Sequence, residues 1–411
     1  VAQALGLSAH SLALDAACAS SLYAVALACH YLQCGKTDLM LAGAVSAADP
    51  FFVNMGFSIF HAYPQHPETC NPLDNKSGGL FASQGAGMFV LKRVDDAERD
   101  GDHIHAVISG IGLSNDGRGH FVLSPKSKGQ MLAYERAYES SQITSAEIDY
   151  IECHATGTPL GDKVELDSME MFFAAPENAN ENKTKPLIGS VKSNLGHMLT
   201  AAGMGGMTKV ILALQNGIIP ATVGVEDVMT SKNEGVSADQ IVRQAADWPH
   251  KLQHRSAAVS AFGFGGTNAH IVFETANTEK LRRKEKLQKK PAYKKQSPTA
   301  IIGMEAIFGG CNGLHEFYQT IYDKKQHFRK LPPERWKGLE QHPELSQVPE
   351  GAWLESFEID FLRFKLQPNP KEHLIPQQLL TLEVTDRALK KTNLREGQNV
   401  AVLVAMETEL E

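Results

Sequence analysis

Short apolar runs alternate with segments rich in Ala, Gly and Ser over residues 1–278, and this alternation is the strongest constraint on the fold. Apolar runs bounded by turn residues predict buried strands, and the small-residue segments between them predict closely packed helices. The pattern is typical of α/β proteins. Strands are predicted at Leu12–Ala16, Leu39–Val45, Met88–Leu91, Ala106–Ser114, Asp149–Cys153, Leu187–Val191, Ala257–Ala261 and Ile271–Glu274, and helices at Ala19–Cys34 and Met198–Leu214.

The composition changes at Glu279. Residues 279–295 carry nine Lys or Arg against two Glu, which is typical of a solvated linker; a nucleic-acid arm is the alternative, but no aromatic or base-reading motif accompanies the charge. We therefore predict a first domain at 1–278, a basic linker at 279–298 and a second unit at 299–411. The second unit has predicted strands at Ala300–Gly303 and Val400–Val404 and predicted helices at Leu314–Tyr322 and Pro376–Lys391.

Composition and charge exclude several classes of protein. With 43% hydrophobic and 21% charged residues the chain is globular, and its net charge of −7 disfavours a nucleic-acid coat. No apolar run is long enough to span a bilayer, so no membrane association is expected. The six cysteines are too sparse for a disulfide framework, which favours a reducing, cytoplasmic location. His250 and His254 have metal-ligand spacing but no third ligand, so no metal site is predicted. The chain begins at Val1 without a Met, and we expect a fragment.

Four junctions that follow predicted strands carry reactive or glycine-rich residues, and such strand ends are where sites form in α/β sheets. They are DAACASS with Cys18, ECHATGTPLGDKVE with His154, KSNLGH with Lys192 and His197, and GFGGTNAH at Gly263–His270. Alone, Cys18 is more often a packing residue and His154 a loop residue. At a helix N-terminus, however, a thiol gains thiolate character, because unpaired amides and the helix dipole favour negative charge.

Together, one cysteine, two histidines and one lysine suit acyl chemistry. A thiolate can accept an acyl group as a thioester. Two imidazoles can donate hydrogen bonds to a second thioester as it becomes an enolate, and backbone amides can hold an oxyanion.

In this order the four motifs resemble the β-ketoacyl synthase (ketosynthase) family of fatty-acid and polyketide assembly, over Val1 to about Thr275. The resemblance implies an acyltransferase of the 3-oxoacyl-[acyl-carrier-protein] synthase type. Cys18 would be the nucleophile, and His154 and His197 would assist malonyl decarboxylation. Lys192 would support them, with Glu165 as its ion-pair partner. The loop after Gly263 would hold the gate and the oxyanion hole, through Phe264 and Gly265.

The segment from Thr299 resembles the beginning of a second family member. IIGMEAIFGG resembles the opening strand and IPQQLLTLEVTDRAL a helix of the family, although Leu379 replaces the usual arginine. A synthase followed by a divergent second copy resembles the ketosynthase and chain-length-factor pair of bacterial polyunsaturated fatty-acid synthases. The alternatives are an ordinary modular polyketide ketosynthase and a non-catalytic chain-length-factor-like scaffold. A thiolase would need a second cysteine in the glycine loop, which GFGGTNAH lacks.

The resemblance implies a thiolase-like layered αβαβα fold, which we expect to be incomplete here because strands that precede Val1 would be missing. No metal or redox cofactor is implied, because the substrates are carried on the phosphopantetheine of an acyl carrier protein. The implied partners are that carrier protein and the second ketosynthase-like domain, packed as a pseudo-dimer.

Overall fold

The structure is a computed structural model of the 411-residue chain. It describes residues 1–47, 50–59, 62–64, 70–116, 124–141, 143–174, 185–249, 254–276, 299–332, 350–354, 357–364, 376–393 and 400–406. The predicted linker at 279–298 lies outside the described residues. In the part that is described, no helix is both long enough and apolar enough to cross a membrane.

The described elements follow the predicted alternation of strands and helices. The strands are β1 (Ser11–Leu14), β2 (Leu39–Ser46), β3 (Gly85–Arg93), β4 (Ala106–Asn115), β5 (Tyr150–Glu152), β6 (Leu187–Gly189), β7 (Ile218–Ile219), β8 (Ala246–Asp247), β9 (Ser256–Gly263), β10 (Thr267–Glu274), β11 (Thr299–Phe308), β12 (Cys311–Asn312) and β13 (Val400–Met406). The helices are α1 (Ser20–Gln33), α2 (Pro50–Ile59), α3 (Val94–Asp100), α4 (Ser127–Ser140), α5 (Pro159–Ala174), α6 (Lys192–Leu195), α7 (Ala202–Asn216), α9 (Leu314–Tyr322) and α10 (Pro376–Leu389).

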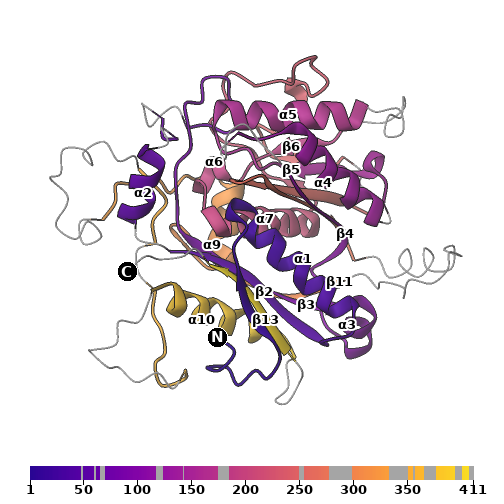
Figure 1. The fold of residues 1–411 in the computed structure, drawn as a ribbon, viewed down its shortest axis with the longest axis vertical. Coiled ribbons are helices and arrows are strands. Elements are labelled where there is room, and N and C mark those ends of the chain that lie inside the picture. Colours follow the sequence, from indigo (N-terminus) through magenta and orange to yellow (C-terminus); the bar gives the residue numbers. More distant parts are fainter. Residues whose placement is uncertain are drawn as a thin grey trace, which may run out of the picture.

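Among the described residues, 11 strands form one mixed sheet, in the order β1-β13-β2-β3-β11-β4-β10-β9-β5-β6, with β12 paired to β11. β5 runs parallel to both β6 and β9, so the ends of these strands meet at one edge of the sheet. β9 and β10 form the antiparallel hairpin that the sequence predicts around the glycine loop. Figure 1 shows helices on both faces of the sheet.

The segment after residue 298 contributes strands to this same sheet. β11 lies between β3 and β4, and β13 lies between β1 and β2. β13 pairs in parallel with both of its neighbours, and β11 pairs antiparallel with β3 over almost its whole length. From the sequence, residues 299–411 are expected to begin a second unit packed against the first. In the structure, the described strands of this segment pair within the sheet of the first segment.

Small residues bring α1 and α7 together on one face of the sheet. A Cβ atom at Gly203 of α7 would overlap Leu22 Cδ1 and Ser21 Oγ on α1. Almost all of α7 is buried, and α1 buries one face; both contribute to the largest apolar cluster. α10 packs in a second apolar cluster, on the opposite face of β2, β3 and β11. The close contact between α1 and α7 is important because each helix begins next to a predicted site residue.

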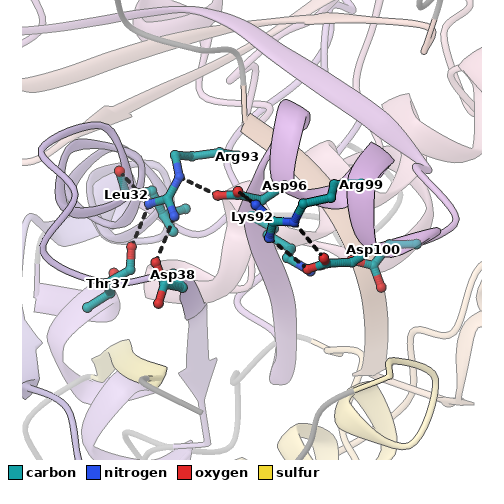
Figure 2. Close-up of polar contacts among 9 residues, drawn as sticks. Leu32, Thr37, Asp38, Lys92, Arg93, Asp96, Arg99 and Asp100 are labelled. Atoms are coloured by element: carbon teal, nitrogen blue, oxygen red, sulfur yellow. Dashed lines mark hydrogen bonds and ion pairs between the residues drawn. The ribbon is translucent and has the colours of Figure 1, made fainter. Parts of the chain in front are cut away.

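Arg93 fastens the end of α1 to the start of β2 (Figure 2). Its guanidinium donates hydrogen bonds to the carbonyl oxygens of Leu32 at 2.9 Å and Thr37 at 2.7 Å, and it pairs with the carboxylates of Asp38 and Asp96. Carbonyls at the end of a helix lack partners within the helix, so the guanidinium satisfies one of them and also holds the following turn. This anchor lies at the opposite end of α1 from Cys18.

Candidate active site

Cys18 lies in the turn between the end of β1 and the start of α1. A short 3₁₀ turn, Ala17–Ala19, separates strand from helix, and Ala17 has a φ of +49°, a left-handed conformation that alanine rarely adopts. The side chain of Asp15 accepts a hydrogen bond from the Ala17 amide at 2.7 Å, and Ser20 Oγ accepts one from the Ala16 amide at 2.8 Å. These contacts hold the strained turn in place, as is common at functional sites.

His197 contacts the thiol of Cys18, although the two residues are far apart in the sequence. Its Nε2 lies 3.0 Å from Cys18 Sγ. The preceding Gly196 has a φ of +72°, and the His197 amide donates to Phe81 O at 2.6 Å, so the turn after α6 is fixed on both sides. Burial, followed by the positive charge of Lys192, lowers the pKa of His197 to about 3. The imidazole is therefore neutral near pH 7, so one of its ring nitrogens can donate a hydrogen bond and the other can accept one.

His154 follows β5 and lies beside His197 and Cys18. Its ring centroid lies 5.4 Å from that of His197, and burial, Lys192 and His197 all lower its pKa. The ligand atoms of Cys18, His154 and His197 all lie within 4.8 Å of one another. A soft divalent ion could also use such a set of donors. That the site works without a metal therefore stays a prediction.

Glu165 supports His154 in a way that the resemblance does not imply. Its carboxylate accepts hydrogen bonds from the backbone amides of His154 and Ala155, both at 2.8 Å, and so holds the loop that carries the histidine. Lys192 is buried, and its Nζ donates to Cys153 O at 3.5 Å. Among the ion pairs of the described residues, none joins Lys192 to Glu165, although the charge of Glu165 does act on Lys192 through space. The direct ion pair expected between them is thus replaced by hydrogen bonds to the backbone.

The glycine loop packs directly on the Cys18 turn. A Cβ atom at Gly263 would lie 2.6 Å from Ala16 O, so only glycine fits there, and Thr267 Oγ1 donates to the same carbonyl at 2.7 Å. Phe264 is 38% exposed, its ring stands 6.2 Å from that of Phe57, and the next residue, Gly265, has a φ of +78°. The loop is therefore placed where its amides could serve an oxyanion at Cys18, and the roles of Phe264 and Gly265 remain predictions.

A pocket of about 410 Å³ opens above the thiol. It is lined by Cys18, His154, His197 and Phe264, and by Thr156 and Thr158 of the loop that follows β5. The motifs that the sequence analysis identifies thus come together around one cavity, in which a thioester could reach the sulfur.

Sequence reasoning missed three buried charged residues that support this pocket. Asp162 accepts hydrogen bonds from the amides of Leu73, Thr156 and Gly157. Glu152 and Lys209 form an ion pair of 2.8 Å whose side chains are 1% and 0% exposed. Charged residues are almost never fully buried unless they are paired, so an acidic residue in the apolar run 149–153 and a lysine in the small-residue helix were the available signals.

Three family models match almost the whole chain. They describe the β-ketoacyl synthase N-terminal domain, over residues 1–97 and 296–411, the β-ketoacyl synthase C-terminal domain, over 105–226, and the ketoacyl-synthetase C-terminal extension, over 239–326. The chain belongs to the β-ketoacyl synthase family. The N-terminal model matches in two pieces on either side of the C-terminal one, which agrees with the resemblance seen in residues 299–411 to the beginning of a family member.

Relatives occur in two kinds of synthase. One component of the polyunsaturated fatty acid synthase of Thraustochytrium sp. is 38% identical over 100% of this chain and 20% of its own length. One component of the phenolphthiocerol/phthiocerol polyketide synthase of Mycobacterium tuberculosis is 39% identical over 67% of this chain and 12% of its own length. The chain therefore spans a fifth or less of the length of these curated relatives.

Solved ketosynthases share the fold. The structure titled PfaC Keto synthase-Chain length factor is 50% identical, with a TM-score of 0.64, and the match covers 96% of this chain and 41% of that one. The ketosynthase from module 6 of the bacillaene synthase from Bacillus subtilis is 33% identical, with a TM-score of 0.59 over 64% of this chain and 46% of that one. The predicted thiolase-like layered α/β fold is confirmed.

Proposed function

We propose that this chain catalyses the decarboxylative Claisen condensation of a malonyl group, held on an acyl carrier protein, with an acyl chain held on Cys18. The observation that carries the proposal is the meeting of Cys18, His154 and His197 around one pocket. A nucleophilic thiol and two neutral imidazoles are the groups that such a reaction needs, and the family to which the chain belongs supports the same chemistry.

The first half-reaction loads the enzyme. Cys18 lies just before the start of α1, where negative charge is favoured, and its sulfur gives up its proton to solvent and attacks the carbonyl carbon of the carrier-bound acyl thioester. The tetrahedral oxyanion is held by backbone amides at the Cys18 turn and the loop containing Phe264. When it collapses, the bond to the carrier sulfur breaks, and the carrier thiolate leaves and takes up a proton from solvent in place of the one that Cys18 released. The acyl chain is then joined to Cys18.

The second half-reaction forms the carbon–carbon bond. The bond between the malonyl carboxylate and its neighbouring carbon breaks, carbon dioxide leaves, and the electron pair moves into an enolate. A neutral imidazole has one N–H, so His154 and His197 can each donate one hydrogen bond to the enolate oxygen. Acylated Cys18 no longer presents the thiol that His197 Nε2 contacts, so the Nε2–H of the neutral ring can donate to the enolate oxygen. The enolate carbon attacks the carbonyl carbon of the Cys18 thioester and the bond to Sγ breaks. The product, longer by two carbons, stays on the carrier, and the Cys18 thiolate takes up a proton from solvent.

We place the reaction in polyunsaturated fatty-acid assembly. The fatty acid synthase relative and the PfaC structure match the chain through residues 299–411, whereas the polyketide synthase relative matches only 67% of it. An ordinary modular polyketide ketosynthase is the alternative. A non-catalytic scaffold is disfavoured because Cys18 is present and is contacted by His197.

The remaining assignments belong to the same proposal. In the complete protein, residues 1–278 would supply the ketosynthase, 279–298 the linker and 299–411 the opening of a second, chain-length-factor-like domain, which would be the pseudo-dimer partner. In this chain, β11 and β13 of that segment add to the sheet of residues 1–278. The phosphopantetheine arm of the carrier enters the pocket lined by Thr156 and Thr158. The six cysteines all lie in the described part of the chain and none is joined in a disulfide, which suits a reducing, cytoplasmic location.

The test separates the two half-reactions in the complete polypeptide. Cys18→Ala should abolish acyl loading from an acyl-carrier thioester, measured by intact mass. His154→Ala and His197→Ala should still load but should release carbon dioxide from malonyl carrier at least about a hundredfold more slowly. A His154→Ala protein that decarboxylates at the wild-type rate would remove His154 from the mechanism, and acyl loading without Cys18 would overturn the proposal.

A further inference from the structure

A buried carboxylate joins the two segments that carry the histidines. Glu152 is the last residue of β5, two positions before His154, and is 1% exposed. Its Oε1 accepts a hydrogen bond from the Val191 amide at 2.5 Å, and Val191 directly precedes the KSNLGH turn. Glu152 therefore connects the strand leading to His154 with the turn leading to His197.

The other oxygen of Glu152 is held by two further residues. Oε2 lies 2.8 Å from Nζ of Lys209 on α7 and accepts a hydrogen bond from the Tyr150 hydroxyl at 2.7 Å. Glycines leave room for this arrangement, because a Cβ atom at Gly206 would lie 3.1 Å from Glu152 Cγ and one at Gly189 would lie 2.8 Å from the Tyr150 hydroxyl oxygen. The carboxylate is thus held by three groups: the Val191 amide, the Lys209 ammonium and the Tyr150 hydroxyl.

We propose that Glu152, held by Lys209, is a positioning residue that sets His197 against Cys18 and His154 through its hydrogen bond to the Val191 amide. The inference rests on the proposed function, because it assigns these residues a role in the same reaction. The histidine pair must meet one small enolate, and a displacement of about 1 Å in such a site can cost about a hundredfold in rate.

Charge supports the same assignment. The site contains Lys192, whose pKa burial lowers and the negative charge of Glu152 raises. The two lysines and Glu152 are all at least nine-tenths buried, so each charge needs a partner nearby. Glu152 forms an ion pair with Lys209, and its negative charge also raises the pKa of Lys192. Lys192 lies between Glu152 and His197 in the sequence.

The experiment separates the hydrogen bond from the buried charge. In a Tyr150→Phe, Lys209→Met background, Glu152→Gln keeps an acceptor for the Val191 amide, whereas Glu152→Met keeps the volume but not the acceptor. We expect the Gln variant to decarboxylate malonyl carrier with a kcat at least about tenfold higher than that of the Met variant, and the KM values of the two to agree within about twofold. Acyl loading of Cys18 should be the same in both. Equal kcat values for the two variants would overturn the proposal.

A second variant removes the same bond from the donor side. Val191 has a φ of −65°, the angle that proline adopts, so Val191→Pro removes the amide hydrogen while Glu152 and Lys209 stay intact. It should also lower the kcat of decarboxylation and spare acyl loading. If the Glu152→Met and Val191→Pro proteins fail to fold while the Gln variant folds, the bond is structural and the positioning role is wrong. If the unsubstituted protein does not decarboxylate malonyl carrier, the proposed function fails instead.

Discussion

Acidification should destabilise the protein through His197 by an amount that the structure sets. The pKa of His197 is about 3 in the folded chain and about 6.5 when exposed. As the pH falls below about 6.5, His197 binds a proton in the unfolded state, whereas in the folded state it does not bind one until about pH 3. The free energy of unfolding therefore decreases as the pH falls through this window. Between about pH 7.5 and about pH 5, this difference in proton binding amounts to about 2 kcal/mol for one such histidine.

The assay is urea denaturation at these two pH values, followed by tryptophan fluorescence, for the wild type and for His197→Gln. Other buried histidines also contribute, so the quantity that tests the reasoning is the difference between the two proteins. The Gln variant should lose about 2 kcal/mol less than the wild type on acidification. His30→Gln, at an exposed position on α1, controls for the removal of an imidazole as such. Equal losses in wild type and His197→Gln would refute the argument that His197 is buried in its neutral form.

Three further predictions follow from packing and exposure. Iodoacetamide should label Cys18, through the pocket, and the exposed Cys34, and peptide mass spectrometry should find the four other, buried cysteines unmodified. Gly203→Ala should lower the free energy of unfolding by about 1–3 kcal/mol because its Cβ would meet α1, whereas Gly56→Ala, which meets nothing within 4 Å, should not. Cleavage at a protease site inserted in 279–298 should leave both pieces co-eluting on size exclusion, since β11 and β13 lie inside the sheet; separate elution would contradict the shared sheet.

The reactive corners could be predicted because they depend on neighbouring residues. Cys18, His154 and His197 each follow a strand or a tight turn whose signal is local, and all three come together in the structure. The apolar run predicts a first strand that ends at Ala16, but the strand ends at Leu14. The side chain of Asp15 accepts a hydrogen bond from the Ala17 amide, and this turn ends the strand earlier than hydrophobicity alone suggests.

Pairing between distant segments could not be predicted in the same way. The position of β11 between β3 and β4 depends on strand register, which is set by contacts between residues about two hundred positions apart, and no short motif encodes it. The Glu152–Lys209 pair could not be predicted for the same reason, since each residue alone is an ordinary charged side chain. The expected partner of Lys192 rests on resemblance alone, and in the structure Glu165 binds the backbone instead.

The distance between the thiol and His197 depends on how two helices meet. Cys18 lies just before α1, His197 lies just before the turn that leads into α7, and the two residues are 179 positions apart in sequence. Gly203 allows α7 to lie against Leu22 of α1, so the beginnings of the two helices come side by side. A larger residue at this contact would move His197 relative to Cys18 without altering either motif. The small residues of α7 are therefore as necessary to the 3.0 Å contact as the KSNLGH turn itself.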